Sequence, residues 1–192
     1  MYSGGLINSP SENVSVRLSN DITLLTPGGV MKFGLNLDQL IIVNLDGEKV
    51  GPHNDVNREL KSTLEFSMHL EVDRHRADVG CVVHAHTSHA AALTVAGLSV
   101  CTQLLTKGML FLGVVSNAPY GVPTTKELSD SIIEFISDHD AIMLRCHDSI
   151  TFGMMSGRPF PAQKSLNGLL KSNISLDNIE KRKGFLNKTS KK

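Results

Sequence analysis

The sequence predicts a single α/β domain. Short segments with the apolar or alternating pattern of β-strands occur between longer segments in which apolar residues recur every three or four positions, as in amphipathic helices. The chain of 192 residues has the length of one domain with a sizeable core. Because no internal repeat or clear linker divides it, we assign residues 1–180 to this domain and residues 181–192 to a basic, flexible tail.

The first predicted elements are three strands. Residues 13–18 alternate between polar and apolar side chains, and we expect Val14 and Val16 to face inward. Residues 22–26 follow a turn and complete a hairpin. Residues 40–45 are almost continuously apolar and precede an Asp-Gly turn, which predicts a strand buried on both faces.

A glycine-rich turn, Pro27-Gly28-Gly29, follows the hairpin. Such a turn can leave backbone N–H groups free to hold an anion. Most turns of this composition have no such role, so both interpretations stand.

A helix is predicted to begin at Ser62, because Leu64, Met68 and Val72 recur along one side of it. Ser62 and Glu65 have the spacing of a capping box, in which the two side chains bond backbone N–H groups at the helix start. On local sequence alone we favour this structural role for Glu65. The alternative is a general base held near a metal ion.

The most informative segment is the strand at residues 81–86, which is apolar until it reaches two histidines one residue apart. Strand alternation places His84 and His86 on the same face. Neutral imidazole is a preferred ligand of Zn²⁺, so this pair is a candidate half of a metal site. The alternative is a pair of surface or hydrogen-bonded histidines.

Further helices are predicted at residues 89–98 and from Thr125 onward, followed by a strand at residues 141–147. This strand also ends in a histidine, His147. If two adjacent strands bring all three histidines together, three protein ligands and one open position make the arrangement of a catalytic zinc. His69 is interpreted instead as a packing or hydrogen-bonding residue.

Composition narrows the classes of function. The 19 basic and 19 acidic residues balance, so nothing indicates binding to nucleic acid or to a membrane surface. Three cysteines without a pairing pattern suggest a reducing compartment. We find no signal peptide and no apolar run of membrane-spanning length, and we therefore expect a soluble, cytoplasmic protein.

Seven motifs follow one another between Leu6 and Gly153. They are Asn-Val-Ser-Val-Arg at 13–17, Leu-Leu-Thr-Pro-Gly-Gly at 24–29, Lys-Ser-Thr-Leu-Glu at 61–65, Arg-x-Asp at 76–78, Val-Val-His-Ala-His-Thr-x-His at 82–89, Ala-Pro-Tyr at 118–120 and Glu-Leu at 127–128. In order and spacing they resemble the zinc-dependent class II aldolases, which share a fold with the adducin head domain. Within that family the likeness is greatest to the fuculose-phosphate aldolases.

The resemblance implies a fold, a metal site and an assembly. The fold is a central, largely antiparallel sheet flanked by helices on both sides. Zn²⁺ would be bound by His84, His86 and His147, and Glu65 would be the acid/base carboxylate. Phosphate contacts are implied for four residues, Asn13, Gly28, Gly29 and Thr63. The assembly would be a homotetramer with active sites between subunits.

Several positions depart from the family pattern. They are Glu12 and Asp148, where the family usually has glycine, Leu64, where it has a hydroxyl residue, and Leu104-Leu105, where fuculose-phosphate aldolases have a tyrosine. The first helix of the family also has no counterpart in this chain. These departures fall mainly on phosphate-binding and proton-donor positions, whereas the three histidines and Glu65 are present.

The sequence therefore predicts a zinc-dependent aldolase that acts on a small hydroxy-carbonyl compound, a ketose phosphate, through a zinc-stabilised enediolate. A dehydratase, a decarboxylase or a pentulose-phosphate epimerase of the same fold is an alternative, although the epimerases usually carry aspartate in place of Glu65. An alternative of another class is an inactive adducin-like interaction module whose basic tail binds an acidic partner. The three histidines favour an enzyme, because an interaction module has no need of them.

Overall fold

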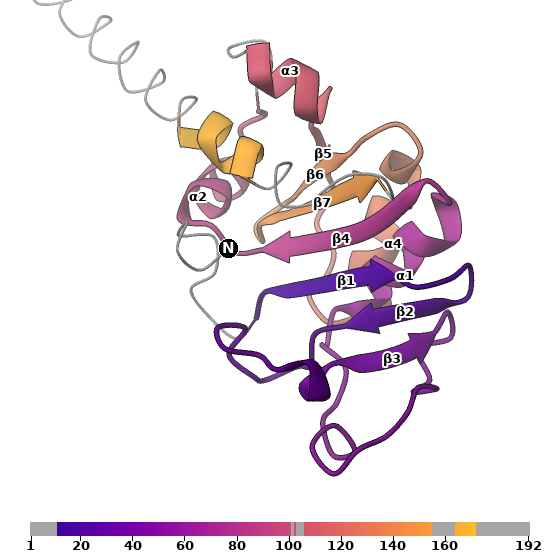
Figure 1. The fold of residues 1–192 in the computed structure, drawn as a ribbon. Helices are drawn as coiled ribbons and strands as arrows, with labels where there is room; N and C mark the ends of the chain where they lie inside the picture. The colour runs from indigo at the N-terminus through magenta and orange to yellow at the C-terminus, as the bar shows by residue number, and fades with distance from the viewer. Residues whose placement is uncertain (1–10, 101, 103–105, 155–163, 172–192) are drawn as a thin grey trace, which may run out of the picture.

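The computed structural model describes residues 11–100, 102, 106–154 and 164–171 (Figure 1). Seven strands form one sheet in the order β3-β2-β1-β4-β7-β6-β5. Their bounds are β1 Asn13–Arg17, β2 Ile22–Leu25, β3 Ile41–Asn44, β4 Val79–Ala85, β5 Ser116–Ala118, β6 Ala141–Leu144 and β7 Ser149–Met154. Only β5 and β6 pair in parallel, so the predicted largely antiparallel sheet is confirmed.

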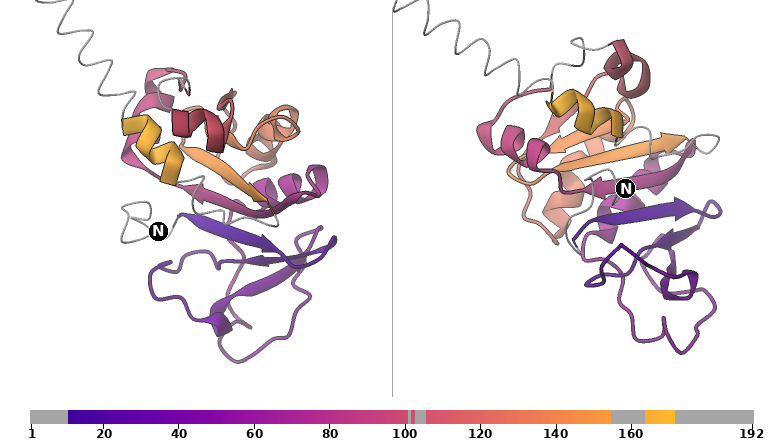
Figure 2. Two further views of the ribbon diagram at one scale, coloured as in Figure 1. Left: turned by 45° about the horizontal axis from the view of Figure 1, so that its top comes forward. Right: turned by 60° about the vertical axis from the view of Figure 1, so that its left-hand side comes forward.

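The helices form two groups on opposite faces of the sheet (Figure 2). They are α1 Phe66–His75, α2 Ser88–Ala96, α3 Thr106–Leu112 and α4 Lys126–Ile136, together with a short 3-10 helix, Leu37–Gln39, and a further helix at 164–171. In β6, Ile142 and Leu144 pack against α1 and α4, whereas Ala141 and Met143 pack against the other group. The alternation of a fully buried strand thus builds two cores.

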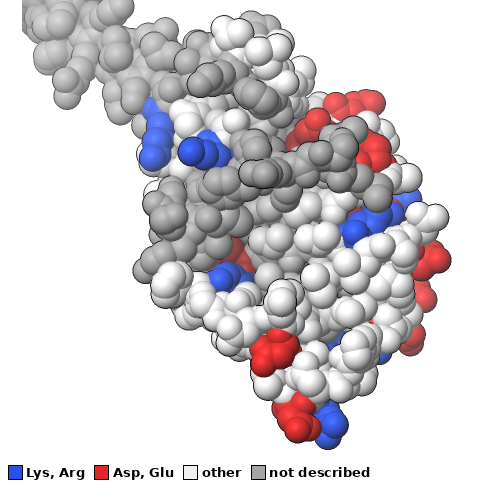
Figure 3. All heavy atoms as spheres, viewed as in Figure 1, with Lys and Arg blue, Asp and Glu red and all other residues white. Residues whose placement is uncertain are grey.

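Among the described residues, a helix covers only one face of the half of the sheet made of β1, β2 and β3. Leu25, Ile41 and Val43 pack against Leu70 of α1, while the surface over these strands is largely uncharged in the view of Figure 3. The expectation that the third strand is buried on both faces is wrong, since Ile42 is only half-buried. The reason is that β3 is an edge strand with a helix on one side.

The predicted inward face of β1 is also wrong. Val16 is exposed and Val14 is half-buried, whereas the polar residues Asn13, Ser15 and Arg17 are buried. These three face α1, whose polar groups hydrogen-bond to them. A strand can bury its polar face in this way only because each buried group finds a partner.

Arg17 shows how this polar contact holds three elements together. Its Nε donates to the carbonyl of Val79 at the start of β4 (3.0 Å), and its Nη2 donates to the carbonyl of Arg76 just beyond α1 (3.0 Å). Nη2 also lies 3.1 Å from a carboxylate oxygen of Asp73 in α1. Burial raises the pKa of Asp73, and the hydroxyl of Thr23 and the charge of Arg17 act against that rise.

The sequence analysis did not predict two of the strands, β5 and β7. β5 is only three residues long, and β7 follows β6 after a tight turn in which Cys146 adopts a positive φ of 54°. The alternation of Ile150 and Phe152 in β7 is a signal that could have identified it. The predicted strand at 141–147 ends at Leu144 for the same reason, because the turn begins there.

Within the described residues, no helix is long and apolar enough to cross a membrane. The proposed flexible tail, residues 181–192, lies outside the part of the chain that the structure describes.

Replacing Arg17 with methionine should lower the free energy of unfolding by about 3 kcal/mol or more, because it leaves the buried carboxylate of Asp73 without its ion pair. Urea unfolding followed by circular dichroism measures this. The matched control is Lys126→Met, which breaks an exposed pair with Asp130 and should cost less than about 1 kcal/mol. Equal effects of the two changes would contradict a structural role for Arg17.

Candidate metal centre

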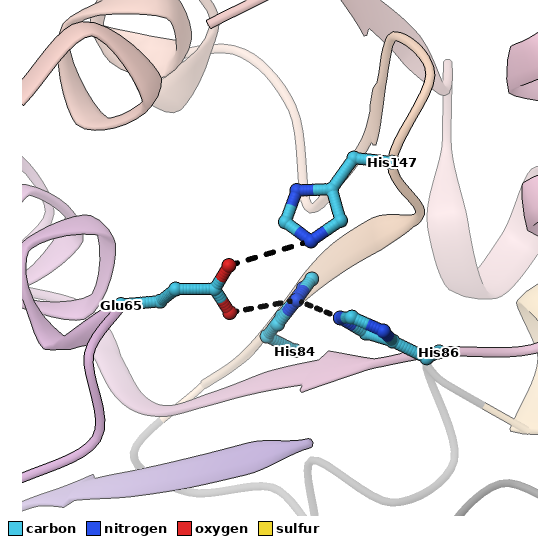
Figure 4. A group of neighbouring side chains, drawn as sticks. All are labelled: Glu65, His84, His86 and His147. Atoms are coloured by element: carbon cyan, nitrogen blue, oxygen red, sulfur yellow. Dashed lines mark hydrogen bonds and ion pairs between the residues drawn. The ribbon is translucent and has the colours of Figure 1, made fainter. Parts of the chain in front are cut away.

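Four side chains from three parts of the fold converge at one point (Figure 4). Glu65 immediately precedes α1, His84 lies near the end of β4, His86 follows β4, and His147 lies in the turn between β6 and β7. One potential ligand atom from each of the four lies within 4.8 Å of those of the others. The structure therefore brings together the three predicted metal ligands and the predicted acid/base.

The sheet explains this convergence, although not through adjacent strands as the sequence suggested. β7 lies between β4 and β6, and its register pairs His84 with Ile150 and Ala85 with Ser149. The turn that precedes β7 is thereby placed beside the end of β4. His147 reaches the other histidines from this turn rather than from a strand.

The donor atoms are arranged as a cation site requires. The Nδ1–H of His84 donates to the carbonyl of Ser149 (2.9 Å), so its Nε2 presents a lone pair in the neutral form. This Nε2 lies 2.7 Å from Nε2 of His86 and 3.2 Å from a carboxylate oxygen of Glu65. Lone pairs and a carboxylate at such distances repel one another unless a proton or a cation lies among them. Imidazole nitrogens with one carboxylate are the ligands that Zn²⁺ prefers, so the residues fit this ion.

The charges of the cluster also suit a metal. Burial lowers the pKa of His86 and of His147, helped by the charge of His84, and each reaches about 4. Burial would raise the pKa of Glu65, but the hydrogen bond with His84 and the charges of the three histidines outweigh it and lower the pKa to about 2. Burial would lower the pKa of His84, but its hydrogen bond with Glu65 and the charge of that carboxylate raise it. Near neutral pH the site therefore offers an ionised carboxylate and the neutral imidazoles of His86 and His147, the forms that bind metals.

The side chain of Glu65 does not cap the helix, so the capping-box interpretation favoured by the local sequence is wrong. The helix begins at Phe66 rather than Ser62, and Glu65 occupies the N-cap position with no side-chain hydrogen bond to the helix start. Ser62 instead forms a bridge with Pro27. The carboxylate of Glu65 lies 3.2 Å from His84 and 3.3 Å from His147. The alternative role of Glu65, a general base near a metal ion, is therefore compatible with its position.

A buried chain of hydrogen bonds runs from Glu65 through Asn13 and His69 to Ser15. The amide nitrogen of Asn13 donates to Glu65 Oε2 (3.4 Å), and the amide oxygen of Asn13 contacts Nε2 of His69. The other nitrogen of His69, Nδ1, lies 2.8 Å from the hydroxyl of Ser15. His69 is thus a hydrogen-bonding residue, as predicted, and it carries its proton on Nε2. The sequence did not reveal that Asn13 positions Glu65.

A cavity of about 130 Å³ borders the cluster. Its lining includes Gly28, Gly29, Thr63, Leu64, Glu65 and Thr124. Three of the four predicted phosphate-binding residues therefore lie beside Glu65. The idea that the glycine-rich turn keeps its N–H groups free is wrong at Gly28, whose N–H donates to Lys61 (2.9 Å). A larger cavity of about 320 Å³ near the end of α2 contains none of the four clustered residues.

The positions that depart from the family pattern have different surroundings. Glu12 is fully buried, and Leu64 is exposed at the edge of the cavity. Asp148 is buried and accepts the backbone N–H of Thr87 (3.1 Å), and burial raises its pKa to about 7. Leu104-Leu105 lies outside the described residues.

Comparison with protein families identifies the family to which the chain is similar. Residues 1–158 match the model of the Class II Aldolase and Adducin N-terminal domain. This match covers most of the chain and includes every residue of the cluster.

Individual proteins agree with the family match. The chain is 30% identical over 152 residues to a 5-deoxy-D-ribulose 1-phosphate aldolase of Bacillus thuringiensis serovar kurstaki, covering 78% of this chain and 68% of that one. It is 26% identical over 164 residues to a methylthioribulose-1-phosphate dehydratase of Sorangium cellulosum, covering 78% and 74%. In fold it is similar to an L-fuculose 1-phosphate aldolase, with a TM-score of 0.80, 20% identity and coverage of 92% and 81%.

The burial of His69 predicts a dependence of stability on pH. Burial lowers its pKa to about 3 in the folded protein, against about 6.5 when unfolded. Below pH 6.5 the unfolded chain therefore binds the additional proton, and this group removes about 1.4 kcal/mol of stability for each pH unit of acidification. Urea unfolding of the chelator-treated protein between pH 4.5 and 6.5 should give a shallower slope for His69→Gln.

The control for this measurement is His75→Gln, at the exposed end of α1. That change should alter the slope less than His69→Gln does. If His69→Gln and the original protein lose stability in parallel on acidification, His69 does not remain neutral in the folded state.

Proposed function

The chain belongs to the family of class II aldolase and adducin N-terminal domains, and we propose that it is a zinc-dependent aldolase that cleaves or forms a carbon–carbon bond in a small ketose phosphate. The observation that carries this proposal is the convergence of His84, His86 and His147 on an ionised Glu65. An interaction module has no use for such a site, which counts against the adducin-like alternative.

In this proposal each residue of the cluster has a distinct task. His84, His86 and His147 would hold Zn²⁺, and the bound ion would supply Lewis-acid polarisation of the carbonyl and hydroxyl oxygens of the substrate. In the cleavage of a ketose 1-phosphate, the C4 hydroxyl loses its proton, C4 becomes an aldehyde as the bond between C3 and C4 breaks, and C3 keeps the electron pair and must accept a proton. Glu65, held by Asn13 at the edge of the cavity, would carry that proton.

A sugar phosphate is the proposed substrate class. The names of the related enzymes are those of enzymes of phosphorylated ketoses. In this chain Gly28, Gly29 and Thr63 line the cavity beside Glu65, which supports the phosphate contacts that the resemblance implies for them. The contact implied for Asn13 has less support, because its amide is already bonded to Ser11, Glu65 and His69.

A dehydratase is the second candidate, since one related protein is a methylthioribulose-1-phosphate dehydratase. The same cluster would serve, with Glu65 removing a proton next to a polarised carbonyl and a hydroxyl leaving as water. Assaying the purified protein on ketose 1-phosphates for released aldehyde and for loss of water distinguishes the two activities.

We also propose that the protein is a homo-oligomer, a tetramer by resemblance. Exposed apolar side chains support a buried contact on the α2 and α3 side. They are Val95, Leu98, Leu110 and Val114. Light scattering coupled to gel filtration tests this, and a mass equal to one chain would reject it.

The metal site predicts one Zn²⁺ per chain in protein purified without chelator. His84→Ala and His147→Ala should each lose most of the metal, because two remaining histidines hold a catalytic zinc weakly. Elemental analysis measures this, with His53→Ala, at an exposed position, as the control. Metal-free original protein that also fails to take up added zinc would reject the proposed enzyme.

Glu65→Gln tests the acid/base assignment. Glutamine keeps the size of the side chain and can still accept the hydrogen bond from Asn13, but it cannot carry a proton. Turnover at saturating substrate should fall on the order of 10²- to 10⁴-fold, while zinc content and the thermal unfolding midpoint stay close to those of the original protein. Glu59→Gln, at an exposed position, is the control. Unchanged turnover of the Glu65 variant would remove Glu65 from the chemistry.

A further inference from the structure

Thr124 is the unexpected member of the cavity beside Glu65. Its φ of +67° lies in the left-handed region, which a β-branched residue rarely adopts. Glycine occupies this region without steric cost. The sequence did not single out this residue, and the proposed reaction as described above does not use it.

The start of α4 imposes this backbone conformation. The N–H and the hydroxyl of Thr125 both donate to the carbonyl of Val122, at 3.2 and 2.7 Å. Gly121 packs so closely on the helix that a Cβ there would come within 2.7 Å of the backbone of Glu127 and Leu128. The backbone is thus held in place on both sides of Thr124, by the hydrogen bonds of Thr125 and by the close packing of Gly121.

The fold gives no reason for threonine in this place. The side chain is exposed, and within the described residues no hydrogen bond involves its hydroxyl. A strained residue persists where the surroundings hold it, and such residues gather at sites of function. Thr124 borders the cavity beside Glu65.

The other walls of the cavity show what the hydroxyl could contribute. Leu64 offers only apolar surface, and the N–H of Gly28 is already used by Lys61. The side-chain donors that border the cavity are therefore the hydroxyls of Ser11, Thr63 and Thr124. A hydroxyl that donates to an anionic oxygen makes a hydrogen bond stronger than a neutral one.

We propose that Thr124 is a specificity-determining residue whose hydroxyl donates a hydrogen bond to the anionic phosphate of the substrate in the cavity beside Glu65. This inference rests on the proposed function, because it takes the cavity to be the place of the phosphate. It explains why a strained threonine, rather than glycine, occupies the turn before α4.

The test uses dihydroxyacetone phosphate, the product that cleavage of a ketose 1-phosphate between C3 and C4 releases. Its binding to the zinc-loaded full chain is measured by titration calorimetry. Thr124→Val removes the hydroxyl and keeps the shape of the side chain, and it should weaken binding roughly 10- to 100-fold. Thr124→Ser keeps the hydroxyl and should bind within about threefold of the original protein. Ser19→Ala, in the exposed turn between β1 and β2, is the control.

A glycine variant separates an effect on phosphate binding from an effect on folding stability. Thr124→Gly relieves the backbone strain, so its thermal unfolding midpoint should rise by roughly 2 to 4 °C while it binds as weakly as Thr124→Val. If Thr124→Val or Thr124→Gly binds dihydroxyacetone phosphate as tightly as the original protein, the inference is overturned. Binding that depends on Thr124 in a protein without aldolase activity would reject the proposed reaction and support the inference. No binding to the original protein would overturn the inference as well.

Discussion

The burial of polar side chains between β1 and α1 is the constraint on which the rest of the molecule depends. Asn13, Ser15 and Arg17 lie on the inner face of β1, where an unpaired polar group would cost more than an apolar contact returns. Each is satisfied by α1, through His69 and Asp73 or through backbone carbonyls. Because hydrogen bonds tolerate little displacement, α1 is fixed along its axis against the sheet. Glu65, which immediately precedes α1, is thereby held in a defined place.

The sheet supplies the complementary half of the site. The antiparallel pairing of β4 with β7 places Ser149 opposite Ala85, and the carbonyl of Ser149 orients the ring of His84. The turn that begins β7 carries His147. Of the three clustered histidines, His84 thus lies on the fully buried strand β4, and His86 and His147 lie just beyond the ends of β4 and β6. The cavity beside Glu65 is bordered by the turns at Gly28 and Thr124. Turns generally vary more in sequence than the strands that they connect, so the lining of this cavity can change while the clustered histidines keep their places.

The electrostatics of the site link its stability to its chemistry. Burial disfavours the charged form of each of the clustered side chains. The lowered pKa values nevertheless leave Glu65 negative and His86 and His147 neutral near neutral pH. A cation bound among the facing donor atoms would offset their remaining repulsion. The same arrangement suits carbon–carbon cleavage and loss of water next to a carbonyl, which agrees with the presence of both aldolases and a dehydratase among the related proteins.

The sequence by itself determined the class of fold, most helices and strands, and the three histidines, because these depend on periodicity and on residue chemistry that are local in the chain. It did not determine which face of β1 is buried, since the apolar alternation of Val14 and Val16 pointed the wrong way and only the polar groups of α1 reverse it. It also assigned Glu65 to a capping box, a local pattern that the packing of Ser62 against Pro27 overrides. The insertion of β7 between β4 and β6 and the strained turn at Thr124 depend on contacts between segments far apart in the chain. Such contacts have no local signature, and only the tertiary structure decides them.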